Sequence, residues 1–185
     1  MLLVSDDHQW GVAVTATLDP LEPDDVELGI DAVVERLQDG PGEVVLILRA
    51  PQEGVWIHTK KFYPQDVFRM PTGSMKDGEE PDEAFRRELL EETGIESADE
   101  PERLARIEYR LGEQDFPYVS YLYAVDGVAD EPQPTDTTEQ ITGWELADLS
   151  ELAVIADDLR DLPDKWNAWG VFRALAHEVL LQIPQ

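Results

Sequence analysis

The sequence contains no cysteine, which excludes disulfides, thiolate metal sites and cysteine nucleophiles. It also has no apolar run of about 18 residues or more, the length that a membrane-spanning helix needs. The opening residues MLLVSDDHQW lack the basic start and long apolar core of a signal peptide. From these absences we expect a soluble, cytoplasmic protein.

Positive charge is scarce as well. The chain has 14 basic and 41 acidic residues, so its formal net charge is −27. Such a surface repels nucleic-acid backbones and anionic membranes, and we expect neither as a partner. The acidic residues are spread along the chain rather than gathered in one tail. Because salt screens repulsion between them, this distribution leads to the hypothesis of a halophilic protein adapted to high salt.

The densest set of chemically useful residues is GSMKDGEEPDEAFRRELLEETGI, residues 73–95. Pro81 and Asp82 stand where a helix would begin, with acidic residues in its first turn. Gly94 stands just beyond its end. The stretch therefore predicts one helix over residues 81–93.

Helical spacing places the carboxylates of Glu88, Glu91 and Glu92 on one face, since they are three and four residues apart. Like charges at that distance repel one another, and a divalent cation removes the penalty. Oxygen-only ligands suit Mg²⁺ or Mn²⁺ better than zinc. Arg87 precedes Glu91 by four residues and can hold a carboxylate by a forked hydrogen bond.

The spacing resembles the Nudix box, the signature of the Nudix hydrolase family, at every defined position. These positions are Gly73, Glu79, Arg87, Glu88, Glu91, Glu92 and Gly94, with apolar Leu89 and Ile95 between and after them. The resemblance implies that Glu88, Glu91 and Glu92 bind the metal, that Arg87 orients them, and that a backbone carbonyl near Gly73 completes the metal shell. It also implies the Nudix α/β/α sandwich fold with a mixed sheet.

Apart from the defined positions of the box, three sets of residues have alternative interpretations. Glu139 either reaches the metal site, where it or Glu88 would act as general base, or is one more exposed acid. Four cations are concentrated beside the box, and they either contact substrate phosphates or protect a strand edge. They are Lys60, Lys61, Arg69 and Lys76. The tyrosines at 118, 121 and 123 either stack on a base or belong to the core.

Hydrophobic patterns predict a mixed order of strands and helices in one domain. We expect residues 41–185 to form the Nudix domain and residues 1–40 to be a strand-helix extension of it, which packs on its own subunit or contributes to a homodimer. The expected strands are 9–18, 43–50, 55–62, 67–70, 103–111, 116–125 and 140–146. The expected helices are 25–38, 81–93, 147–155 and 164–182.

The function expected from this resemblance is Mg²⁺-dependent hydrolysis of a diphosphate bond in a nucleoside diphosphate linked to another group. The substrate would be a small nucleotide-type molecule such as an ADP-ribose-like compound, a nucleotide sugar or a nucleoside triphosphate. The alternative is a non-catalytic Nudix-fold module that senses a nucleotide. The box keeps Glu79 and all three helix glutamates, which favours the enzyme.

Overall fold

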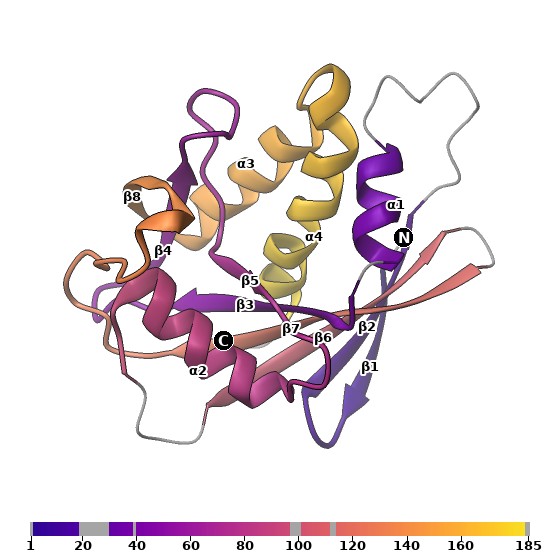
Figure 1. Cartoon of the computed structure of the whole chain (residues 1–185), viewed down its shortest axis with the longest axis horizontal. Coiled ribbons are helices and arrows are strands. Elements are labelled where there is room, and N and C mark those ends of the chain that lie inside the picture. Colours follow the sequence, from indigo (N-terminus) through magenta and orange to yellow (C-terminus); the bar gives the residue numbers. More distant parts are fainter. Residues whose placement is uncertain (1, 19–29, 39, 97–100, 112–113, 184–185) are drawn as a thin grey trace.

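The computed structural model describes residues 2–18, 30–38, 40–96, 101–111, 114–183 of the chain. These residues form two sheets and four α-helices (Figure 1). No helix among them is long and apolar enough to cross a membrane. The strands are β1 (Leu2–Asp7), β2 (Gly11–Leu18), β3 (Gly42–Leu48), β4 (Val55–Lys60), β5 (Thr72–Ser74), β6 (Glu102–Leu111), β7 (Gln114–Val125) and β8 (Ile141–Ala147). The α-helices are α1 (Ile30–Gln38), α2 (Pro81–Thr93), α3 (Leu149–Arg160) and α4 (Asn167–Gln182), and short 3₁₀ turns η2 (Thr137–Glu139) and η3 (Asp164–Trp166) precede β8 and α4.

The larger sheet has the strand order β1-β2-β6-β7-β3-β5 and is mixed. The pairs β2–β6 and β3–β7 are parallel, whereas β1–β2, β6–β7 and β3–β5 are antiparallel. Strand β3 is buried along its whole length, as expected of an apolar strand that is covered on both faces. Its side chains therefore alternate between two separate cores.

Helices cover both faces of this sheet, and the expected α/β/α sandwich is confirmed (Figure 1). On one face, α2 packs through Phe85 and Leu89 against Val44 and Leu46 of β3. On the other face, α1 and α4 pack on the alternate side chains of β3 and on β6 and β7. Helix α3 lies against α4 rather than on the sheet alone.

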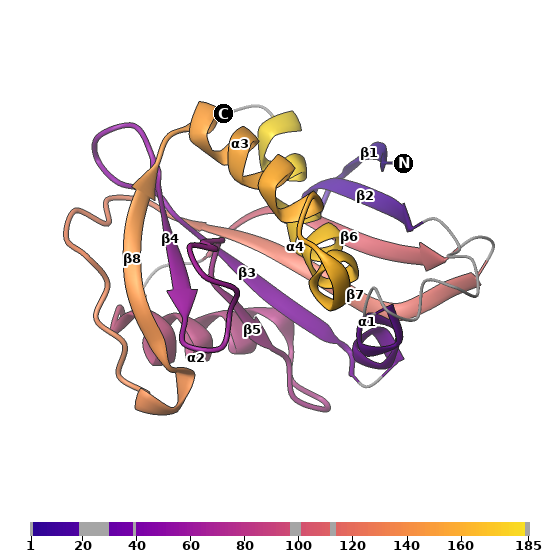
Figure 2. The same cartoon turned by 90° about the horizontal axis from the view of Figure 1, so that it is seen from above.

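The smaller sheet pairs β4 with β8 antiparallel, and Figure 2 shows the two strands side by side. In this register Val55 faces Ala147 at one end, and Lys60 faces Ile141 at the other. The Lys60 end adjoins Glu139, which stands two residues before Ile141. The small sheet thus fixes Lys60 and Glu139 relative to each other.

Two expectations about strands were wrong. Residues 67–70 form no strand but a single bridge, in which His58 and Arg69 exchange two backbone hydrogen bonds of 2.9 and 3.0 Å. Pro71 follows and has no N–H to extend the ladder. The second is the omission of β1 and β5: the exposed side chains of β1 show no apolar alternation, and β5 has only 3 residues.

Other boundaries moved by a few residues. The strand expected over 9–18 begins at Gly11, because the Asp7 carboxylate accepts hydrogen bonds from the N–H groups of Gln9 and Trp10 and holds a turn there. Helix α3 extends to Arg160, beyond the expected end at 155. Of the helix expected over 25–38, residues 25–29 lie outside the described part of the chain.

Candidate active site

Helix α2 has the beginning and end that its sequence predicts. Pro81 occupies its first turn, and the Glu83 carboxylate accepts a hydrogen bond of 3.2 Å from the Glu80 N–H. Gly94 ends it in the left-handed conformation with φ of 72°. A Cβ at this position would lie 2.5 Å from the carbonyl oxygen of Gln133. The glycine therefore allows the chain before β8 to approach the helix end.

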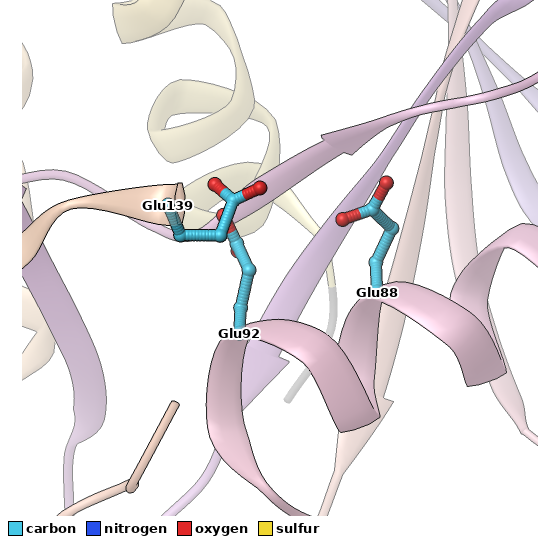
Figure 3. A group of neighbouring side chains, drawn as sticks. All are labelled: Glu88, Glu92 and Glu139. Atoms are coloured by element: carbon cyan, nitrogen blue, oxygen red, sulfur yellow. The ribbon is translucent and has the colours of Figure 1, made fainter. Parts of the chain in front are cut away.

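Three carboxylates converge beside this helix. Glu88, Glu92 and Glu139 each offer one oxygen, and these oxygens lie within 4.8 Å of one another. Glu88 and Glu92 rise from neighbouring turns of α2, and Glu139 reaches over from the segment that precedes β8 (Figure 3). We call these three residues the acid cluster. Helical spacing accounts for the first two members and tertiary structure for the third.

The position of Glu139 depends on how the chain before β8 docks on α2. The backbone N–H groups of Thr135 and Asp136 both donate to the carbonyl oxygen of Glu91, at 3.0 and 3.1 Å. The Thr135 hydroxyl donates to the carbonyl of Leu90 at 2.7 Å. The last carbonyls of a helix have no partner within it, so this segment satisfies them. The same docking brings Glu139 to the acid cluster.

Glycine at position 73 makes room for Glu88. A Cβ built on Gly73 would overlap the carboxyl group of Glu88. Gly73 lies in β5, paired with Val44 of β3, so its backbone cannot easily retreat. The close approach explains the first defined position of the box and places the Gly73 backbone beside a cluster oxygen.

Arg87 holds the carboxylates on one side of the cluster. Its Nε and Nη2 donate to the two oxygens of Glu79, both at 2.8 Å, as a forked pair. Its Nη1 donates to Glu88 at 2.5 Å and to Glu91 at 3.1 Å. Glu91, 35% exposed, is thus drawn toward the arginine and is not part of the acid cluster. The sequence assigned no such role to Glu79.

Lys60 lies on the other side, between two cluster members. Its Nζ donates to Glu92 at 2.8 Å and also to Glu139. Glu92 is fully buried, and burial raises its pKa to about 7 despite the neighbouring ammonium. Burial also raises the pKa of Glu88. Carboxylates desolvated in this way favour a nearby cation.

The acid cluster opens into a cavity of about 300 Å³. Glu88, Glu139, Lys60 and Arg69 line it, so two of the four expected cations reach the site. Lys61 and Lys76 are exposed and are not among the described lining residues. Residues that the sequence did not single out also line the cavity, namely Arg36, Tyr63, Trp169 and Arg173.

The three tyrosines of β7 lie away from this cavity's described lining. Tyr118 and Tyr123 are buried in the cores on opposite faces of the sheet. Tyr121 is half-buried and packs on the Trp10 ring, with centroids 4.7 Å apart. Packing in the core therefore explains the first two, and a contact with the turn between β1 and β2 explains the third.

The NUDIX domain family model matches residues 29–170. The chain belongs to the Nudix family. This match covers β3 to β8, all of α2 and α3, and the cluster glutamates. The protein belongs to the class of pyrophosphohydrolases, which are enzymes that act on phosphorus anhydrides. Strands β1 and β2 precede the matched Nudix region but continue its sheet.

Solved structures similar to this Nudix chain are remote in sequence. An Ap4A hydrolase from C. elegans is 18% identical, with 62% of this chain and 86% of that chain covered and a TM-score of 0.46. A MutT protein from Methanosarcina mazei is 14% identical, covering 76% and 97%, with a TM-score of 0.45. The dihydroneopterin triphosphate pyrophosphohydrolase of E. coli is 18% identical, covering 63% and 84%, with a TM-score of 0.40. A search of curated proteins found no match.

Proposed function

We propose that this Nudix protein hydrolyses the diphosphate bond of a nucleoside diphosphate linked to another group, and that the reaction requires Mg²⁺ or Mn²⁺. The observation that carries the proposal is the acid cluster: Glu88 and Glu139 line one cavity with Lys60 and Arg69, and the buried Glu92 offers an oxygen within 4.8 Å of theirs. Carboxylate oxygens for a hard cation and cations for phosphate oxygens then face the same small ligand.

The residues present fit a divalent ion. One oxygen of Glu92 is buried without a hydrogen-bond partner among the described residues, and the missing Cβ of Gly73 lets the Glu88 carboxyl group lie against the β5 backbone. Glu88, Glu92 and Glu139 would hold the ion, with the Gly73 carbonyl and Glu91 as the further ligands that the Nudix resemblance implies. When bound, the ion supplies charge neutralisation and polarises phosphoryl oxygens.

The chain's own residues divide the remaining work. Arg87 fixes the direction of the Glu88 carboxylate, and Lys60 attracts the oxygens of the diphosphate. Glu88 or Glu139 takes the proton from the attacking water, because both line the cavity. Glu92 is less suited to that role because it is fully buried and bound to Lys60.

The test is hydrolysis of a panel of nucleoside diphosphate derivatives and nucleoside triphosphates with Mg²⁺ or Mn²⁺ in high salt. Glu92→Gln should lower kcat/KM by about 100-fold or more, because it removes a buried ligand charge. Glu96→Gln, an exposed glutamate just beyond α2, is the matched control and should retain activity. Tight nucleotide binding without turnover across the panel would instead identify a non-catalytic sensor.

A further inference from the structure

We propose that Arg36, Arg69 and Arg173 form an anion subsite that binds a second oxyanion of the substrate, apart from the diphosphate that is cut. The ligand would be a nucleoside diphosphate derivative whose far group carries a carboxylate or a phosphate. This inference rests on the proposed function for the scissile diphosphate. It adds the chemistry of the group on the other side of that bond.

Arg69 is a buried cation without a carboxylate partner. It is 4% exposed and makes no ion pair with any residue that the structure describes. Its guanidinium donates to neutral oxygens, namely the Met70 carbonyl at 2.7 Å, the Thr72 hydroxyl at 3.1 Å and the Tyr63 hydroxyl. Its Nε is buried and has no hydrogen-bond partner among the described residues. Buried arginines are normally paired, so an anion from outside the chain would complete this one.

The other two arginines share one carboxylate. Glu43 accepts from Arg36 at 2.9 Å and from Arg173 at 2.8 Å, and Arg173 is 6% exposed. The Nε atoms of Arg36 and Arg173 are also buried, and no described residue forms a hydrogen bond with either. The three guanidinium groups thus have one carboxylate, Glu43, to neutralise them. The carboxylates of the acid cluster are paired with Lys60 and Arg87 instead. The surplus positive charge is retained in a chain of net charge −27.

Geometry connects this surplus to the reacting site. All three arginines line the same cavity of about 300 Å³ as Glu88 and Glu139, so one ligand can contact both groups. Arg69 is held rigidly, with its guanidinium 5.1 Å from the Tyr63 ring centroid and 6.0 Å from that of Trp169. Preorganised guanidinium forks bind planar carboxylates and phosphates well.

A purely structural role for the arginines predicts a different result. If they only joined α1, β3 and α4, their loss would lower stability and reduce all activities alike. An anion subsite instead predicts that their loss changes the choice between substrates. The measurement must therefore compare substrates that differ only in the far charge.

The experiment uses two matched pairs of substrates with the metal-loaded protein. UDP-glucuronate differs from UDP-glucose by a carboxylate, and ADP-ribose 1″-phosphate differs from ADP-ribose by a phosphate. We expect kcat/KM to favour the charged member of at least one pair by about tenfold or more, the worth of one good charge-assisted contact. The pair that shows the preference identifies the source of the oxyanion. Equal kcat/KM within both pairs would overturn the subsite.

Variants then assign the preference to the arginines. Arg69→Gln and Arg36→Gln should each reduce the charged-to-neutral ratio of kcat/KM about tenfold, and Arg69→Lys should reduce it less. Arg106→Gln, which removes a cation that is bound to Asp7 and does not line the cavity, should leave the ratio as in the parent protein. Arg36 is partly exposed, so its variant remains informative if Arg69→Gln fails to fold. A ratio that none of the cavity variants changes would contradict the proposal.

A second readout needs no turnover and separates this inference from the proposed function. Binding of inorganic phosphate to the metal-free protein is measured by calorimetry in the parent protein and the same variants. Binding that weakens at least tenfold in Arg69→Gln, and not in Arg106→Gln, supports the subsite even if no panel substrate is hydrolysed. Equal phosphate affinity in the parent protein and every variant contradicts the subsite even if diphosphates are cut.

Discussion

Gly73 shows how much of the site depends on a missing side chain. Its replacement by alanine would place a Cβ in the space of the Glu88 carboxyl group. We expect Gly73→Ala to lower kcat/KM by about 100-fold, because a shift of about 1 Å in a catalytic group has that effect. It should also reduce the rise in melting temperature that Mg²⁺ produces.

Gly40→Ala is the matched control, because a Cβ at Gly40 would meet nothing within 4 Å. It should leave both measurements close to those of the parent protein. A Gly73→Ala protein with full activity and an unchanged response to Mg²⁺ would show that Glu88 does not need this space.

His177 is a second residue whose environment makes a measurable prediction. Its Nε2 accepts a hydrogen bond of 3.3 Å from the Met70 N–H, so Nδ1 carries the proton and donates to the Arg173 carbonyl at 3.2 Å. Burial lowers its pKa to about 4, and the cations Arg69 and Arg173 add to the shift. The folded protein therefore holds this imidazole neutral in a pH range where the unfolded chain protonates it.

Because the pKa of His177 is lowered in the folded protein, its contribution to stability is fully present above a pH of about 6.5. The contribution is lost progressively as the pH falls toward 4. The shift corresponds to about 3 kcal/mol of unfolding free energy across that window. Urea unfolding at a series of pH values should show a shallower decline for His177→Gln than for the parent protein. The exposed His8→Gln is the control, and an equal decline in both variants would contradict the assignment.

Helix α4 supplies a prediction at the scale of elements. Gly170, in its first turn, lies against the end of α3, and a Cβ there would overlap the carbonyl oxygen of Leu159. Both partners are backbone, so neither can move without separating the helices. Gly170→Ala should lower the unfolding free energy by about 1 to 3 kcal/mol, the usual cost of overpacking. The urea midpoint measures this, and a midpoint equal to that of the parent protein would show that the helices separate freely.

The helices and strands that the sequence pattern predicts correctly have strong local signals. Helix α2 has a proline at its start, a glycine at its end and apolar residues on one face, and the structure gives it the expected bounds of 81–93. The strands expected over 103–111 and 116–125 are also confirmed, and they pair antiparallel as β6 and β7. Strand β1 has no such signal, because it is an edge strand with exposed side chains that gains order by pairing with β2.

The residues of the candidate site also fall into those that the sequence predicts and those that it does not. Spacing within one helix predicts that Glu88, Glu91 and Glu92 project together. The structure brings Glu88 and Glu92 together, whereas Glu91 turns toward Arg87. Spacing cannot predict that Lys60 lies between Glu92 and Glu139, because that contact depends on the β4–β8 register. The sequence analysis also did not predict that Arg173 lies at the cavity. The available signal was a charged residue on the otherwise apolar face of α4.

At the scale of the whole molecule, the large negative charge makes stability depend on salt. With a net charge of −27 and a calculated isoelectric point near 4.1, the folded chain repels itself at low ionic strength. We expect the melting temperature to rise by several degrees between 10 mM and 1 M NaCl, with much of the rise by roughly 0.2 M, where the Debye length is under about 10 Å.

A matched series in sucrose separates screening from solvent exclusion, because sucrose strengthens burial without screening charge. The halophilic hypothesis further expects loss of the fold on desalting. Full stability in dilute buffer would contradict that hypothesis, and a melting temperature independent of NaCl would contradict the role of self-repulsion.

The place of β2 in the sheet has a consequence for the order of events during synthesis. Val12 of β2 pairs with Ala105 of β6, and no other strand among the described residues joins the β1–β2 hairpin to the sheet. The hairpin emerges from the ribosome before its parallel neighbour, which follows only after β3, β4, β5 and α2. Val14 and Ala16, which end up in the core, stay uncovered in the meantime. Strands β1 and β2 are thus made well before they can join the sheet, and a nascent chain paused before β6 would be the form most prone to aggregate.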